Sequence, residues 1–256
     1  MAQFCSYSTL GVRVHAVQIP DVIARMEEWI AKREACRFIA VTDMHSVMEA
    51  QQDERFKAIL NSADLVVPDG FPLVWLGRRK GFRRLRRRVY GPELMLRFCE
   101  ESAPKAYRHF FFGGAPGVAE EVARRFASKF PGLVVAGAFC PPFRLLTARE
   151  NEAAITVIER SRADIVWVGL GAPKQERWMF ANRDNLRVPV LVGVGAAFDF
   201  HAGRVAQAPV WMREHGLEWF FRLLQEPRRL WHRYLVYGTQ FAFYVLLELF
   251  CLRRFE

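Results

Sequence analysis

Two glycine-bearing segments, Gly169-Leu-Gly-Ala-Pro-Lys-Gln-Glu176 and Gly193-Val-Gly-Ala-Ala-Phe-Asp-Phe200, decide the fold class of this chain. Each follows directly on a short, uninterrupted apolar run, Ile165-Val-Trp-Val168 and Val190-Leu-Val192. Such runs are typical of strands that are buried on both faces of a parallel sheet. Because ligands bind at the carboxyl ends of these strands, the two segments predict adjacent strand ends at one ligand crevice.

The composition of both segments favours a phosphate-bearing ligand. Glycine lets a phosphate approach the backbone amides at the start of a helix. The polar side chains also exceed what an ordinary connecting loop needs, although a pair of tight strand-to-helix turns is the alternative. The candidate residues are Gly169, Gly171, Lys174, Gln175, Glu176, Gly193, Gly195 and Asp199.

Strands and helices alternate through most of the remaining chain. This succession predicts an α/β fold, a Rossmann-like parallel sheet of about six strands flanked by helices. The expected elements are a helix at 20–30, a strand at 38–41, a helix at about 44–60, strands at 65–67 and 109–112, a helix ending near 130 and a strand from 133.

The C-terminal part has a different pattern, with two consecutive helical stretches and no strand between them. We therefore expect an α/β core at 1–215 and a helical appendage at 216–256. The stretch 234–252 is largely apolar and would form a helix about 28 Å long, close to the thickness of a bilayer. Gln240 and Glu248 interrupt it, which favours an interfacial helix over a spanning one. Packing on the protein's own core or in an oligomer is the alternative.

Missing motifs argue against several classes of protein. The segment Gly113-Gly-Ala-Pro-Gly117 lacks the spacing GxGxxG, and GxxxxGK[ST] does not occur, so a nicotinamide enzyme and a phosphate-loop nucleotidase are disfavoured. The five scattered cysteines predict neither a disulfide framework nor a zinc site and fit a reducing cytosol. The first ten residues do not resemble a secretion signal.

The 256 residues carry a formal net charge of +10, and eight basic residues crowd the segment 78–88. An anionic partner is expected, and nucleic acid, a membrane surface or a phosphorylated substrate would satisfy this. A nucleic-acid-binding protein is the weaker alternative, because Phe82 is the only aromatic residue in the cluster and single-strand binders interleave several.

Asp69 is the leading candidate for a catalytic base. It follows the predicted strand 65–67 directly, between a proline and a glycine. A carboxylate fixed there is suited to removing a proton from an attacking hydroxyl, although capping of the next helix is the alternative. Thr42 and Asp43 end the preceding strand, where Asp43 is a second acid, an orienting partner or a helix cap.

We expect no metal ion and no other cofactor. The chain has no DxD sequence, the common means of holding a divalent cation on a nucleotide diphosphate. Glycine amides at helix starts, Lys174 and arginines from the helical tail would supply the counter-charge to a leaving group.

Taken together, the motifs of this chain closely resemble those of the WecG/TagA/CpsF glycosyltransferases, glycosyltransferase family 26. The match runs in order over nearly the whole chain. It is carried by Pro68-Asp-Gly70, Arg88-Val-Tyr-Gly91, Phe112-Gly-Gly-Ala-Pro-Gly117, the segments 169–176 and 193–199, Ala202-Gly203, Ala208-Pro209 and Gly216-Leu-Glu-Trp-Phe-Phe-Arg222.

The resemblance implies an inverting enzyme of the GT-E type that moves a sugar from a UDP-sugar to a polyprenyl-diphosphate-linked sugar in cell-surface polysaccharide synthesis. It implies a peripheral protein at the cytoplasmic face of the inner membrane, open to self-association, with no nucleic-acid partner. Asp69 would be the base with Thr42 beside it. The donor pocket would include Gly113, Gly114, Gln175, Gly195 and Asp199, and the acceptor diphosphate would meet Arg88, Arg222, Arg228, Arg229 and Arg233.

One position departs from the family pattern. Many members carry asparagine where this chain has Asp43, and two nearby carboxylates would influence each other's ionisation. A non-catalytic UDP-sugar-binding protein is the remaining alternative.

Overall fold

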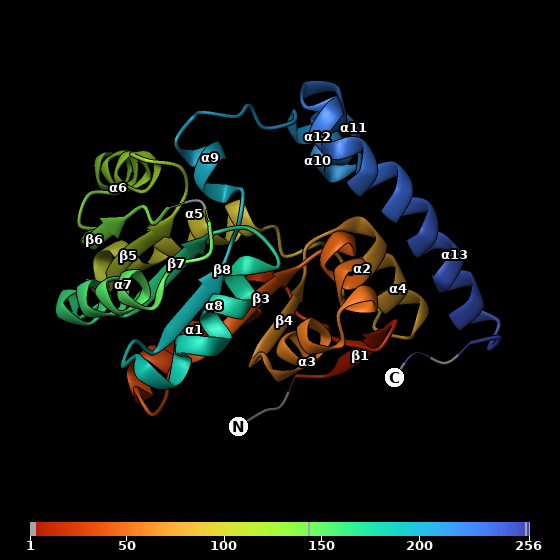
Figure 1. The fold of residues 1–256 in the computed structure, drawn as a ribbon, viewed down its shortest axis with the longest axis horizontal. Helices are drawn as coiled ribbons and strands as arrows, with labels where there is room; N and C mark the ends of the chain where they lie inside the picture. Colours follow the sequence, from red (N-terminus) through yellow and green to blue (C-terminus); the bar gives the residue numbers. More distant parts are fainter. Residues whose placement is uncertain (1–3, 143, 254, 256) are drawn as a thin grey trace.

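The computed structural model describes residues 4–142, 144–253 and 255, and its centre is a parallel sheet (Figure 1). The six strands lie in the order β4-β3-β8-β7-β5-β6, and every described pair of neighbours is parallel. The predicted α/β class is thereby confirmed. The strands are β3 (Arg37–Thr42), β4 (Leu65–Pro68), β5 (Arg108–Gly113), β6 (Val134–Phe139), β7 (Ile165–Gly169) and β8 (Val190–Gly193).

Helices cover both faces of the sheet, because alternate strand side chains point to opposite sides. Phe38 and Ala40 belong to one buried cluster, and Ile39 and Val41 to the other. The first cluster includes side chains of α2 (Met44–Gln52), α3 (Glu54–Ser62), α4 (Phe71–Arg79), α7 (Ala148–Ser161) and α8 (Lys174–Asn182), and the second includes α1 (Ile19–Lys32), α5 (Gly91–Ser102), α6 (Val118–Lys129) and α9 (Ala197–His201).

In the first sixty residues one element was not predicted and one expectation was wrong. An antiparallel hairpin, β1 (Ser6–Thr9) with β2 (Val12–His15), precedes the first helix and extends the core beside β4. The helix expected at 44–60 is two helices, because Asp53 accepts hydrogen bonds from the amides of Arg55 and Phe56 and starts a new one.

The C-terminal appendage consists of helices, as predicted, and lies along one side of the core (Figure 1). The 215/216 boundary itself stays a prediction. Its elements, with the short helix before it, are α10 (Val210–Glu214), α11 (Glu218–Gln225), α12 (Pro227–Trp231), a π-helical turn η3 (His232–Val236) and α13 (Tyr237–Leu249).

The helix α13 has one face on the protein's own core. Tyr237, Phe241 and Val245, spaced four residues apart, are buried against it, so the alternative of core packing holds for this face. Glu248 is bound near its end by Lys80, which also donates to the Ser8 carbonyl. Among the residues that the structure describes, no helix is long and apolar enough to span a bilayer.

Candidate active site

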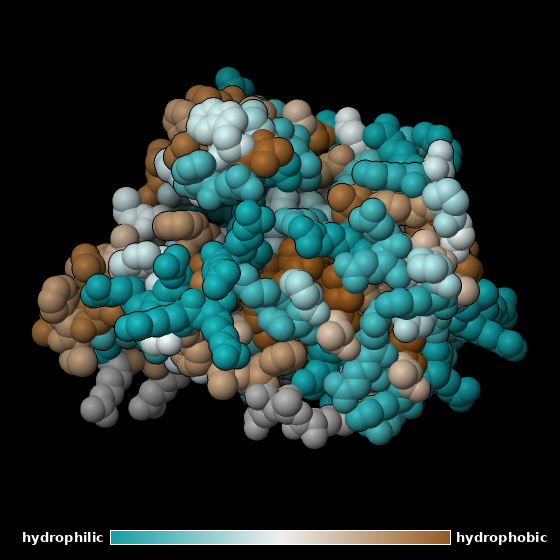
Figure 2. Space-filling view, turned by 180° about the vertical axis from the view of Figure 1, so that it is seen from behind, coloured by the Kyte–Doolittle hydropathy of each residue, from teal (hydrophilic) through white to brown (hydrophobic). Residues whose placement is uncertain are grey.

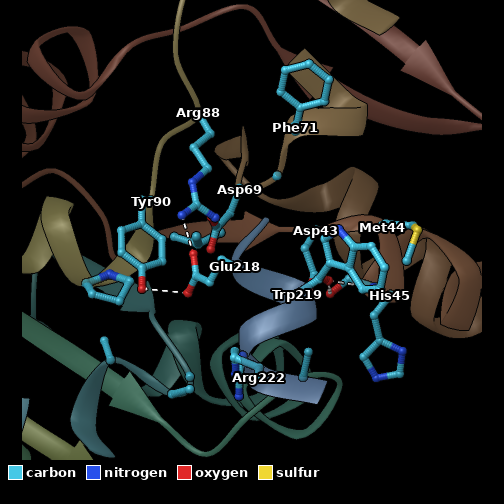
Figure 3. Close-up of a pocket in the computed structure, with 18 of the residues that line it drawn as sticks. Asp43, Met44, His45, Asp69, Phe71, Arg88, Tyr90, Glu218, Trp219 and Arg222 are labelled. Atoms are coloured by element: carbon cyan, nitrogen blue, oxygen red, sulfur yellow. Dashed lines mark hydrogen bonds and ion pairs between the residues drawn. The ribbon is translucent and has the colours of Figure 1, made fainter. Parts of the chain in front are cut away.

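A large open cleft lies where the carboxyl ends of β3, β4, β7 and β8 face the appendage (Figure 3). Its volume of about 1890 Å³ exceeds the 300–1,000 Å³ of an ordinary small-molecule pocket and leaves room for two substrates. It brings together most of the predicted site residues: Asp43, Asp69, Arg88, Gly114, Gly169, Gly171, Lys174, Gln175, Gly195, Asp199, Arg222, Arg229 and Arg233.

Five predicted site residues do not line this cleft: Thr42, Gly113, Glu176, Gly193 and Arg228. Thr42 is buried, and its carbonyl accepts a hydrogen bond from the backbone amide of Asp69 at 2.7 Å. Thr42 thus fixes the backbone of Asp69 without lining the cleft itself. Arg228 is exposed on α12.

Asp69 sits at the end of β4 and does not cap the following helix. Gly70 occupies the capping position of α4, which has no side-chain cap, so the capping alternative is wrong. The Asp69 side chain is 21% exposed, yet its Oδ1 atom is buried without a hydrogen bond. The nearest positive group is Nη1 of Arg88, 3.6 Å from Oδ1.

The surroundings of Asp69 make it a suitable proton acceptor near neutral pH. Burial raises its pKa to about 7, and the positive charge of Arg88 opposes this rise without cancelling it. The negative charges of Glu218 and Asp43 add to the rise. A pKa near the working pH is what general base catalysis requires.

Asp43 has the opposite electrostatic setting. Its carboxylate accepts hydrogen bonds from the amide of Ser46 at 2.9 Å and from the guanidinium of Arg233 in η3, so it caps α2 and binds the appendage. Burial alone would raise the pKa of Asp43, but Arg233, His45 and the Ser46 amide together outweigh burial, and the pKa falls to about 2. The two carboxyl groups in this cleft therefore differ in ionisation, and of the two only Asp69 has a pKa near neutral pH.

Glu218 is a cleft residue that the sequence prediction missed, although it lies in the segment 216–222 that carried the family resemblance. One oxygen accepts from Nη2 of Arg88 and the other from the Tyr90 hydroxyl at 2.8 Å (Figure 3). Arg88 also lies over the Tyr90 ring, 4.1 Å from its centroid. Arg88 is therefore held by protein groups in this cleft.

The two opening segments meet as predicted, since β7 and β8 are neighbours with Val168 opposite Gly193. Gln175 connects them: its Oε1 accepts from the Gly195 amide at 3.0 Å, and its Nε2 donates to Glu176 at 2.8 Å. Glu176 is buried behind this contact, and burial raises its pKa to about 7. Gln175 thus fixes the relative position of the two strand ends.

The glycines at these strand ends have two different roles. A Cβ atom on Gly113 would lie 2.5 Å from the backbone of Gly169, so this glycine allows close strand packing. Gly171, by contrast, has φ +76° and open space around its missing Cβ, three residues before the start of α8. Gly171 is the position where a phosphate can approach the backbone.

The described residues contain no group of three or more His, Cys, Asp or Glu side chains suited to a metal ion.

The comparison with known protein families identifies the class of protein to which this cleft belongs. The model of the glycosyl transferase WecG/TagA/CpsF family matches residues 7–255.

The chain belongs to this family. A relative from Bacillus spizizenii strain W23 is 31% identical over 218 residues, which cover 85% of this chain and 82% of the relative. One of Bacillus subtilis strain 168 is 30% identical over 200 residues, 77% and 74% of the two chains. Both are named N-acetylglucosaminyldiphosphoundecaprenol N-acetyl-beta-D-mannosaminyltransferase. The prediction of a hexosyltransferase is confirmed.

Proposed function

We propose that this WecG/TagA/CpsF enzyme transfers a hexosamine from a UDP-sugar to a polyprenyl-diphosphate-linked sugar, with Asp69 as the general base. The names of the two relatives support N-acetylmannosamine as the transferred sugar and N-acetylglucosaminyl-diphosphoundecaprenol as the acceptor. The observation that carries the proposal is Asp69 itself, a cleft carboxyl with one unbonded oxygen and a pKa of about 7.

The proposed step is a single displacement. Asp69 takes the proton of the acceptor hydroxyl, whose oxygen forms a bond to the anomeric carbon of the donor sugar. The bond from that carbon to the UDP phosphate breaks on the opposite side, so the configuration inverts. The start of α8 beyond Gly171, together with Lys174, faces the cleft and would stabilise the charge of the departing diphosphate.

Acceptor binding is assigned to the appendage side of the cleft. Arg222, Arg229 and Arg233 reach the lining from α11, α12 and η3. Three guanidinium groups beside one opening suit a diphosphate, which they can bind through charge-assisted hydrogen bonds.

Donor binding tests the proposal directly. Calorimetric titration is expected to show binding of UDP-N-acetylmannosamine in preference to UDP-glucose, UDP-N-acetylglucosamine and UDP-glucuronate. Because the proposed counter-charges are protein groups, affinity in EDTA should equal affinity in magnesium. Failure of all four donors and of UDP itself to bind would contradict the proposed function.

The pH dependence of transfer should report Asp69. Only the ionised carboxylate accepts a proton, so kcat/KM is expected to fall about tenfold per pH unit below a midpoint near 7 and to level off above it. Rates measured from pH 5.5 to 9, with stability checked at each pH, provide the test. A flat profile down to pH 5.5 would exclude a base with a raised pKa.

The membrane partner is proposed from the surface around α4. No acidic residue occurs in 70–92, while Arg83, Arg84 and Arg86 are exposed and, in the described part of the chain, form no ion pair. Phe71 and Trp75 of α4 are 58% and 43% exposed. Figure 2 shows hydrophilic side chains projecting beside apolar ones on the side where α13 lies. Basic and aromatic groups together fit the interface of an anionic, cytoplasmic leaflet.

Replacing Arg83 and Arg84 with glutamine is expected to weaken binding to vesicles that contain phosphatidylglycerol by about 30-fold, since each basic residue contributes about 1 kcal/mol. Sedimentation measures the change. Glutamine at Arg124 and Arg149, exposed on α6 and α7, is the matched control and should change little. Equal losses in the two double variants would contradict a specific basic surface.

A further inference from the structure

One acidic residue of the appendage enters the surroundings of the proposed base. Glu218 is the first residue of α11 and is 7% exposed. Both of its oxygens are used: one accepts from Arg88 and the other from the Tyr90 hydroxyl. A carboxylate that is so enclosed remains in place only because both donors are present.

Arg88 connects Glu218 to Asp69. Its Nη2 donates to Glu218, while its Nη1 lies 3.6 Å from Oδ1 of Asp69. Its guanidinium plane is also held over the Tyr90 ring at 4.1 Å. These contacts leave the arginine little freedom to turn, so Glu218 determines where the positive charge stands relative to Asp69.

We propose that Glu218 is a positioning residue that holds Arg88 3.6 Å from Asp69, short of a hydrogen bond, and thereby makes the base dependent on docking of the appendage. This inference rests on the proposed function of Asp69. Glu218 contacts neither reacting atom. It acts through Arg88, and it also places a second negative charge near the base.

The expected direction follows from the charges that face Asp69. The positive charges of Arg88 and the more distant Arg233 favour the ionised form of Asp69. The negative charges of Glu218 and Asp43 disfavour it, and the Tyr90 hydroxyl nearby is neutral. Removing the charge of Glu218 removes a repulsion and frees Arg88 for Asp69, so the pKa of Asp69 should fall. Removing Arg88 should raise it. A residue that supports the fold without a charge near Asp69 would give neither shift.

The experiment is an NMR titration of full-length protein carrying aspartate labelled with ¹³C at Cγ, with the Asp69 signal assigned by its absence in Asp69→Asn. Relative to the wild-type midpoint, Glu218→Gln is expected to lower the midpoint by about one pH unit or more, and Arg88→Gln to raise it. Glu226→Gln is the matched control, because Glu226 makes an exposed ion pair with Arg229 in the same appendage. It should leave the midpoint unchanged.

An unchanged midpoint in Glu218→Gln, or shifts of the same sign in Glu218→Gln and Arg88→Gln, would overturn the inference. If Glu218→Gln does not fold, a downward shift is still demanded of Glu218→Asp, whose shorter side chain withdraws the charge from Arg88. The titration needs no turnover, so it separates the two proposals. Opposite shifts without sugar transfer would refute only the proposed function, and transfer without shifts only this inference.

Discussion

Asp69→Asn is expected to lower kcat for sugar transfer by about 10²- to 10⁴-fold, the usual contribution of a general base. The amide keeps the size and shape of the carboxyl group but accepts no proton. Since Asp69 is fixed by backbone contacts of β4 and Thr42, the cleft should keep its form and bind the UDP-sugar normally. Single-turnover transfer to a lipid-linked acceptor, with calorimetry of donor binding, measures both parts.

The same variant is expected to be more stable at pH 8, by on the order of 1–3 kcal/mol. The pKa of Asp69 in the folded protein, about 7, is higher than that of an unfolded aspartate. Between these two values the unfolded chain loses its proton and the folded chain keeps it, so the stability of the wild type falls as pH rises and stays low above about 7. Asp184 is exposed, so Asp184→Asn is the control for both the transfer rate and the stability, and it should change neither. Near-normal turnover of Asp69→Asn would refute the assignment of the base.

Arg233→Gln is expected to lower kcat/KM for the lipid-linked acceptor by about 10²- to 10³-fold, because a half-buried charge pair is broken and one proposed diphosphate contact is lost. Asp43 would remain in the cleft without its guanidinium partner. That loss should also lower the free energy of unfolding, and Asp43→Asn should restore part of it in the double variant. Initial rates at varied acceptor concentration and chemical denaturation provide the measurements.

Arg228→Gln is the matched control for this prediction. Arg228 is exposed, lies five residues earlier in the same appendage and does not line the cleft. Equal losses in Arg228→Gln and Arg233→Gln would mean that the net charge of the appendage matters, and that the position of Arg233 in the cleft does not.

The central part of the fold was predictable because buried parallel strands leave a distinct pattern. The runs before Gly169 and Gly193 are apolar without alternation, and the glycine segments mark where they end. The hairpin β1–β2 was not predictable in this way, since two strands of four residues give too short an alternation. Its place is set by tertiary contacts, including the Val66 amide, which donates to Nδ1 of His15 at 3.0 Å.

The site was predictable where one segment supplies the chemistry, and not where distant segments combine. Asp69 was found from its place after a strand and before a glycine. Its pKa is raised first by burial and further by the charge of Glu218, whose contact with Arg88 spans 130 positions of the chain. In sequence, Glu218 is only an acidic residue in the first turn of an amphipathic helix.

The location of Glu218 and Arg233 in the appendage bears on how the enzyme is made. Both residues follow the entire sheet in the chain, so during synthesis they reach the cleft only after the last strand has been made. A ribosome that stops before codon 233 releases a chain in which the partner of Asp43 is absent. Such a product would also lack Tyr237, Phe241 and Val245, which belong to the buried core, so the proposed site and part of its support would be missing together.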